Sequence, residues 1–121
     1  GIDINFIERK GLKNALHILY LFTTNATVEY LYTITKILVE NGIDLNAQDK
    51  HGSIPLKYAI TVIRNPIEDI KIVYQYLIER GSNYNIKNNY GKSCKDFALE
   101  SSKEMICYCL CQRRIVLKIR L

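Results

Sequence analysis

The sequence contains no tryptophan, no glycine-rich phosphate-binding loop and no long apolar segment. Its apolar runs fall short of the roughly 18 residues that a membrane-spanning helix needs, so we expect no membrane partner. No secretory leader follows Gly1, and because Gly1 is not methionine the chain is expected to be a piece of something longer. We expect a monomer or part of a longer chain. Wholesale disorder is excluded, because 48% of the 121 residues are hydrophobic and 24% are charged, as in one globular domain or a short repeat array.

Acidic residues are missing from the C-terminal end of the chain, after Glu104. Four of the five excess positive charges lie there, at Arg113, Arg114, Lys118 and Arg120. Residues 1–112 carry 13 lysines and arginines against 12 acids and are close to neutral. A nucleic-acid interface needs a broad basic face, whereas four charges on one tail are typical of a solvated end. We therefore expect no nucleic-acid partner.

Cysteine and histidine are few and do not form a metal-ligand pattern. The four cysteines are Cys94, Cys107, Cys109 and Cys111, and three of them fall within five residues, which argues against a framework of spread disulfides. The two histidines, His17 and His51, are not in a zinc-ligand spacing. Free cysteine behaves mostly as a small hydrophobe. We predict buried thiols in a reducing, intracellular and cytoplasmic location, with no metal and no cofactor.

The sequence does contain an internal repeat. Three segments share the pattern Gly-x-(Asp or Asn)-apolar-Asn, and they begin at Gly1, Gly42 and Gly81, 41 and 39 residues apart. A second glycine follows ten residues after the first in every segment, at Gly11, Gly52 and Gly91. Three segments in one register are very improbable by chance, so we predict units at 1–41, 42–80 and 81–114.

Each unit predicts a short helix and a longer one. Apolar residues at i, i+3 and i+4 precede each unit boundary: Ile34, Ile37 and Leu38; Val73, Tyr76 and Leu77; Ile106, Cys109 and Leu110. This is the spacing of one helix face. Gly42 and Gly81 are predicted helix stops, because glycine adopts the left-handed conformation at low cost. The short helices are expected to start at Asn14, at Ser53 or its neighbour, and at Ser93, with Pro55 in a first turn.

The second unit closely resembles the ankyrin repeat. The Thr-Pro-Leu-His-x-Ala core of that family is represented by Ile54-Pro55-Leu56-Lys57-Tyr58-Ala59. Unit three keeps Ser93 and Ala98 of this core, and unit one keeps Leu16-His17, so the resemblance covers residues 1–112. It implies an all-α fold, an ankyrin-repeat solenoid of about three helix-turn-helix units with intervening turns or hairpins. It also implies that His17 ties neighbouring turns together.

The units are longer than the usual ankyrin repeat of about 33 residues, and the surplus falls at 22–27 and 61–69. The composition favours residues with A/T-rich codons: 18 Ile, 11 Lys and 10 Asn against 5 Ala. Lengthened, irregular repeats with this bias are similar to poxviral ankyrin-repeat proteins of the host-range type, and to those of some intracellular bacteria and protists. The viral resemblance implies docking to a host protein. The F-box-like segment that often ends the viral proteins is not visible here.

The resemblance implies that turn tips and first helices form a partner-binding groove. The predicted tips are 7–10, 48–51 and 87–90. The candidate contact residues are Gln48, Lys50, His51, Lys57, Tyr58, Lys87, Asn88, Asn89, Tyr90, Lys95 and Asp96. Tyr58 and Tyr90 suit anchors because tyrosine offers a large contact area at a low entropy cost, although both could instead be partly buried packing residues. Asp49 is expected to stabilise its turn rather than to contact a partner.

Nothing in the sequence indicates catalysis. Glu68 and Asp69 are adjacent acids without a nearby base, at a predicted helix start where acids favour the dipole. Cys107 would need a histidine neighbour and a lowered pKa to act as a nucleophile. We therefore predict a non-enzymatic protein–protein interaction module. The alternative is an internal structural segment of a larger ankyrin-repeat adaptor, such as a ubiquitin-ligase substrate adaptor, that makes no partner contact itself.

Residues 115–121 form a basic-apolar C-terminal tail. Arg114 stands where a third glycine stop is expected, so we predict a helical extension with an unfinished apolar end. If the tail is loose, deleting 115–121 should lower the melting temperature by less than about 5 °C, the size of a loss of about 1 kcal/mol in a domain this small.

Overall fold

The computed structural model describes residues 3–100, which form five α-helices and no β-strand. The helices are α1 (Ala15–Phe22), α2 (Val28–Glu40), α3 (Pro55–Thr61), α4 (Ile67–Glu79) and α5 (Cys94–Glu100). The predicted all-α class is confirmed for this part of the chain. The third long helix, predicted around Ile106, Cys109 and Leu110, the unit end at 114 and the tail 115–121 lie outside the described residues, as do the thiols after Cys94.

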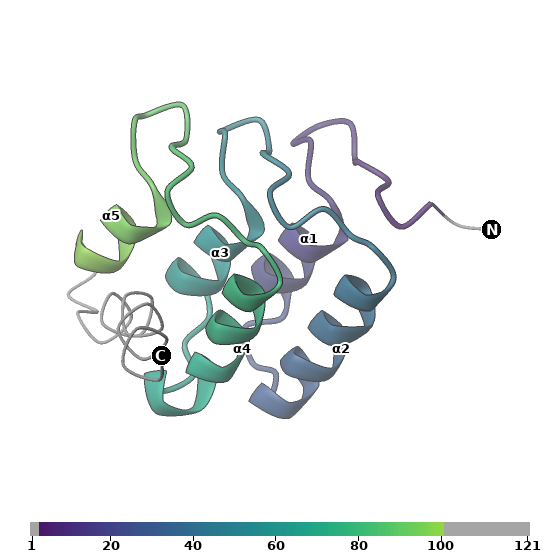
Figure 1. The fold of residues 1–121 in the computed structure, drawn as a ribbon, viewed down its shortest axis with the longest axis vertical. Helices are drawn as coiled ribbons and strands as arrows, with labels where there is room; N and C mark the ends of the chain where they lie inside the picture. Colours follow the sequence, from purple (N-terminus) through teal and green to yellow (C-terminus); the bar gives the residue numbers. More distant parts are fainter. Residues whose placement is uncertain (1–2, 101–121) are drawn as a thin grey trace, which may run out of the picture.

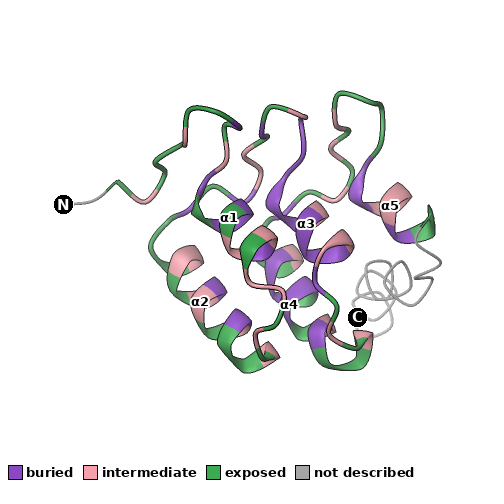
Figure 2. Cartoon of the chain, turned by 180° about the vertical axis from the view of Figure 1, so that it is seen from behind, coloured by how far each residue is buried: buried purple, intermediate pink, exposed green. Residues whose placement is uncertain are grey.

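The helices form two rows. Figure 1 shows α1, α3 and α5 side by side in one row and α2 and α4 in the other, with the loops that precede the first row projecting on the same side. α3 packs between α1 and α5, and α4 packs against α2. The core lies between the rows and includes Leu16, Leu31, Leu56, Ile60, Val73 and Leu77. Figure 2 shows buried residues concentrated on α3, the middle helix of its row.

Helix starts follow the predicted capping residues at two of three positions. The Asn14 side chain accepts hydrogen bonds from the N–H groups of Leu16 and His17 at the start of α1. Ser93 and Asp96 form a reciprocal pair at the start of α5, in which each side chain accepts from the backbone N–H of the other. α3 is different.

At α3 the N-cap position is Ile54, the neighbour of Ser53, and no side chain caps the helix. The prediction of a helix start at Ser53 or its neighbour is therefore confirmed at the neighbour, although without a side-chain cap. The physical reason is Pro55: a proline at the first helical position has no N–H to satisfy, and its fixed φ already suits a helix. The Ser53 N–H is instead directed to the Asp49 carboxylate, 3.0 Å away.

Both predicted glycine stops are confirmed. Gly42 has φ +90° and Gly81 has φ +111°, in the left-handed region. After α2, the N–H of Gly42 donates to the Val39 carbonyl and the N–H of Ile43 donates to the Leu38 carbonyl. The same pair of bonds follows α4, so both long helices end in a Schellman motif that satisfies carbonyls of the last turn.

The surplus residues of the long units lie in the loops between paired helices, 23–27 and 62–66. The second loop is shorter than predicted, because residues 67–69 already belong to α4. Glu68 and Asp69 lie in the first turn of that helix, where negative charge is favourable. The two loops touch, since the Asn65 side-chain amide donates to the Ala26 carbonyl over 3.3 Å.

Candidate interaction surface

Each projecting loop is held by one acceptor side chain in the same register. Asp49 accepts from the N–H groups of His51 and Ser53 at 2.9 and 3.0 Å. Asn88 accepts from Tyr90 and Lys92, and Glu8 accepts from Lys10, Gly11 and Lys13. The predicted turn-stabilising role of Asp49 is therefore confirmed. The register also aligns three residues at the outermost bend of the loops: Lys10, His51 and Tyr90.

The three loops are bonded to one another through their backbones. The Lys50 N–H donates to the Gly11 carbonyl at 2.8 Å, and the Asn89 N–H donates to the His51 carbonyl at 2.9 Å. The Asn89 side-chain amide adds a bond to the Lys50 carbonyl at 2.9 Å. Gln48 donates to the Gly52 carbonyl within its own loop. Positions in the loops are thus fixed by a continuous network before any partner binds.

His51 and Tyr90 form an exposed aromatic pair across the second and third loops. Their ring centroids are 6.4 Å apart with an interplanar angle of 28°, and the Tyr90 hydroxyl lies 3.5 Å from His51 Nδ1. The Tyr90 side chain is 71% exposed. Of the two tyrosines predicted as anchors, Tyr90 is therefore the one that a partner can reach.

Tyr58 is buried, which favours the packing alternative for this residue. Only 6% of it is exposed, and its hydroxyl donates to the Asp49 carboxylate. Burial of Asp49 on its own raises the pKa of that carboxyl, but the hydrogen bonds from Tyr58, Ser53 and His51 outweigh it and lower the pKa. Burial and the neighbouring carboxylate raise the pKa of Tyr58. Tyr58 thus supports the second loop from beneath.

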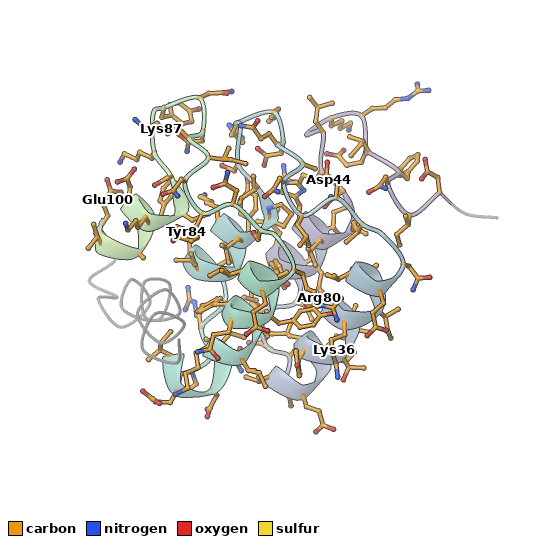
Figure 3. All side chains as sticks on the ribbon, viewed as in Figure 1. Lys36, Asp44, Arg80, Tyr84, Lys87 and Glu100 are labelled. Atoms are coloured by element: carbon orange, nitrogen blue, oxygen red, sulfur yellow. The ribbon has the colours of Figure 1, made fainter. Side chains whose placement is uncertain are left out.

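The remaining predicted contact residues divide into exposed and engaged groups. Lys87 and Lys50 are exposed, and Figure 3 shows Lys87 at the third loop. Lys57 is half-buried, with Nζ 4.5 Å from the centre of the Tyr58 ring, and burial lowers the pKa of its ammonium. Lys95, on α5, is partly exposed. The Asp96 carboxylate accepts from both the N–H and the hydroxyl of Ser93, so it caps α5.

His17 links two units. Its Nδ1 accepts from the Asn14 N–H at 3.1 Å, so in the neutral ring the proton is on Nε2, which donates to the Ser53 carbonyl at 2.8 Å. The side chain is fully buried, and burial lowers the pKa of the imidazole below its usual value. This is the structural role that the family resemblance implied.

A cleft that the sequence did not predict opens beside the first loop. It is lined by Glu8, Lys10, Gly11, Lys13, Ile18, Phe22 and Lys50. Phe22 is 78% exposed and Ile18 is 39% exposed, one turn apart on α1. The available signal was the helix alignment: counted from the helix starts at Ala15 and Pro55, Ile18 corresponds to Tyr58, which the sequence predicted as a contact residue.

Other types of site have no support in residues 3–100. No group of three or more His, Cys, Asp or Glu in this range could hold a metal ion. No helix in the same range is long and apolar enough to cross a membrane. Cys94 is buried, and this burial raises the pKa of its thiol to about 12, so the thiolate that a nucleophile requires is scarce.

Comparison with known proteins agrees with the repeat pattern. No protein-family model matches the chain. A fowlpox virus (strain NVSL) protein named as an ankyrin repeat protein, FPV233, is 38% identical over 65 residues, which is 54% of this chain. The chain spans only 12% of the length of that relative. The resemblance to poxviral ankyrin-repeat proteins that the sequence motifs indicated is confirmed.

Proposed function

We propose that the chain is a non-enzymatic protein-interaction module, an ankyrin-repeat solenoid that binds a host-cell protein through its projecting loops and first helices. The similarity to a viral ankyrin repeat protein supports the class. The two rows of helices with loops on one side support the solenoid (Figure 1). We propose the cytoplasm of a host cell as the location of the chain, on the basis of the similarity to a viral ankyrin repeat protein.

One observation carries the proposal: reachable side chains stand on loops that are already rigid. Tyr90 is exposed and His51 is partly exposed, while the second and third loops that carry them are hydrogen-bonded to each other. A surface ordered in advance loses little conformational entropy on binding, so a few aromatic contacts suffice for affinity. Exposed loops that depended on a partner for their shape would lack these inter-loop bonds.

The test replaces the aromatic pair. A partner is first isolated by affinity capture from host-cell lysate with the chain as bait, identified by mass spectrometry and purified. The double variant His51→Ala/Tyr90→Ala should raise its dissociation constant by at least about tenfold, because few anchors carry most of the binding energy. The control Tyr30→Ala/Gln75→Ala removes exposed side chains from α2 and α4 and should bind normally. Normal binding by the His51→Ala/Tyr90→Ala variant would show that the partner contacts a different surface of the chain.

A second candidate is an internal structural segment of a larger ankyrin-repeat adaptor. The observation that favours it is a repeated asparagine clasp. The Asn5 side chain bonds the Gly42 carbonyl and the Asp44 N–H, and Asn46 bonds Gly81 and Asn83 in the same way.

Asn85 has this register in the third unit, but its side chain makes no hydrogen bond to residues 3–100. It could clasp the turn of a further unit. If partner binding by a longer protein survives all surface changes in residues 3–100, this candidate replaces the first.

A further inference from the structure

Charged residues are divided unequally between two parts of the described chain. The loops with their first helices, residues 7–22, 48–61 and 87–100, carry eight lysines and arginines and four acids. The other described residues carry four against seven. Figure 3 places Lys36 and Arg80 near α2 and α4, away from Lys87 on its projecting loop. The proposed binding side is therefore net positive, and the rest of the described chain is net negative.

The four acids on the positive side are already engaged by the chain itself. Glu8 and Asp49 hold the backbone of their loops, and Asp96 caps α5. Glu100 pairs with Lys92 at 2.7 Å. By contrast, Lys10 and Lys50 are exposed and have no carboxylate within ion-pair distance in residues 3–100.

The cleft beside the first loop combines these lysines with apolar surface. Lys10, Lys13 and Lys50 line it together with Ile18 and Phe22 of α1. Lys13 is the least free of the three, since its Nζ is 3.7 Å from the buried Asp49 carboxylate. We call Ile18 and Phe22 the apolar floor of the cleft. Apolar side chains beside lysines are complementary to a segment that carries carboxylates next to a large apolar side chain.

Resting on the proposed function, we propose that this cleft binds an acidic segment of a protein partner. A large apolar side chain of that segment packs on Phe22 and Ile18, and its neighbouring carboxylates pair with Lys10 and Lys50. The two ends of the contact have different physical roles. Ile18 and Phe22 contribute affinity, because apolar surface is removed from water on binding. The lysines favour negatively charged segments and raise the association rate.

A basic face is also typical of nucleic-acid binding, so that class must be compared. Two observations favour protein. The cleft contains the aliphatic side chain of Ile18, on which a base does not stack as it does on an aromatic ring. Among the eight basic residues only Arg9 is an arginine, the side chain whose planar fork suits phosphate best.

The experiment selects ligands without assuming their identity. A random dodecapeptide display library is panned on the 121-residue chain, and enriched peptides are synthesised. We expect them to share aspartate or glutamate around one large apolar residue. Replacing those acids by asparagine and glutamine should weaken binding by at least about tenfold, because the pairing with lysine is lost.

Variants of the chain locate the contact. Lys10→Glu/Lys50→Glu should weaken the enriched peptides by at least about tenfold, and Phe22→Ser should do the same. The matched control Lys36→Glu/Arg64→Glu makes the same change of net charge outside the loops and first helices and should alter binding by less than about twofold. Circular dichroism of each variant checks that the helices are intact.

Several results would overturn the inference. The proposal of an acidic partner would be wrong if the enriched peptides are neutral or basic, or if they bind the Lys10→Glu/Lys50→Glu variant as tightly as the unchanged chain. The proposed interaction module would still stand in that case. Loss of self-association in Phe22→Ser during sedimentation would assign the cleft to a second copy. Competition by an oligonucleotide, lost in Lys10→Glu/Lys50→Glu, would assign it to nucleic acid. If neither a peptide nor a lysate protein binds, the proposed function fails as well.

Discussion

A buried polar side chain, Asp49, gives the second projecting loop its shape. The Asp49 carboxylate accepts from the Tyr58 hydroxyl and from the N–H groups of His51 and Ser53. An amide in its place can still accept from both N–H groups through its one oxygen, but it loses the negative charge and turns an NH₂ group toward the Tyr58 hydroxyl. Asp49 therefore links the packing of α3 to the position of His51, which stands in the proposed binding surface.

Asp49→Asn should lower the free energy of unfolding by about 1–3 kcal/mol, because hydrogen bonds to a charged acceptor contribute more than those to a neutral one. The measurement is urea unfolding at pH 7. Asp44→Asn is the matched control, because the exposed Asp44 carboxylate accepts only from the Asn46 N–H and its loss should cost less than about 0.5 kcal/mol. Equal losses in the two variants would show that the hydrogen bonds of Asp49 contribute no more to stability than the one of Asp44.

His17 predicts a fall in stability on mild acidification. Burial holds the pKa of the folded imidazole below the value of about 6.5 in the unfolded chain. The unfolded state therefore binds the proton more readily, and the stabilisation is complete above pH 6.5 and declines as the pH drops below it.

Urea unfolding between about pH 7.5 and 5.5 should reveal this decline, with a slope no steeper than about 1.4 kcal/mol per pH unit. The slope is measured for the unchanged chain, for His17→Gln and for His51→Gln as the matched histidine substitution. His17→Gln should lose most of it while reducing stability at every pH. A slope that survives in His17→Gln would assign the pH dependence to another group.

The asparagine clasp joins one repeat to the next and can be tested against itself. Asn46→Ala removes bonds of 3.0 Å to the Gly81 carbonyl and 2.8 Å from the Asn83 N–H. We expect a loss of about 1–2 kcal/mol, since a net hydrogen bond contributes about 1 kcal/mol. Asn85→Ala has the same register and chemistry but no such partners in residues 3–100, so it should be neutral within about 0.5 kcal/mol. Thermal and urea unfolding of the Asn46→Ala and Asn85→Ala variants measure the two losses of stability. Equal losses would contradict a stabilising role of the clasp.

Two glycines in the left-handed conformation should respond differently to alanine. Gly42 has φ +90° and no neighbouring atom within 4 Å of the place that a Cβ would take, so Gly42→Ala should cost only about 1–2 kcal/mol of backbone strain. At Gly52, with φ +79°, a Cβ would lie 2.8 Å from the Asn89 backbone nitrogen. Gly52→Ala should therefore cost clearly more and should also disturb the third loop. Unfolding free energies rank the two, and an equal cost would mean that the loops can separate.

The repeat register predicted a large part of the fold, because it depends on local chemistry. Glycine stops and the Asn14 and Ser93 caps follow from neighbours a few residues away in sequence. The predicted face of α2 is less accurate, because Ile37 is 49% exposed. The burial of Tyr58 and the cleft at Phe22 could not be predicted in the same way. Both depend on which faces of α1 and α3 meet, and the charge division appears only when residues from three units are placed on one side.

Because α3 packs between α1 and α5, damage in the middle unit should spread to both neighbours. Leu56 is fully buried in α3, and Leu56→Ala should cost about 2–5 kcal/mol, a large part of the stability of a domain of this size. Leu99→Ala removes the same atoms from a residue that is 55% exposed and should cost far less. Hydrogen exchange followed by mass spectrometry should show faster exchange of α1, α3 and α5 together in Leu56→Ala. Acceleration confined to α3 would mean that the units unfold independently and would contradict a shared core.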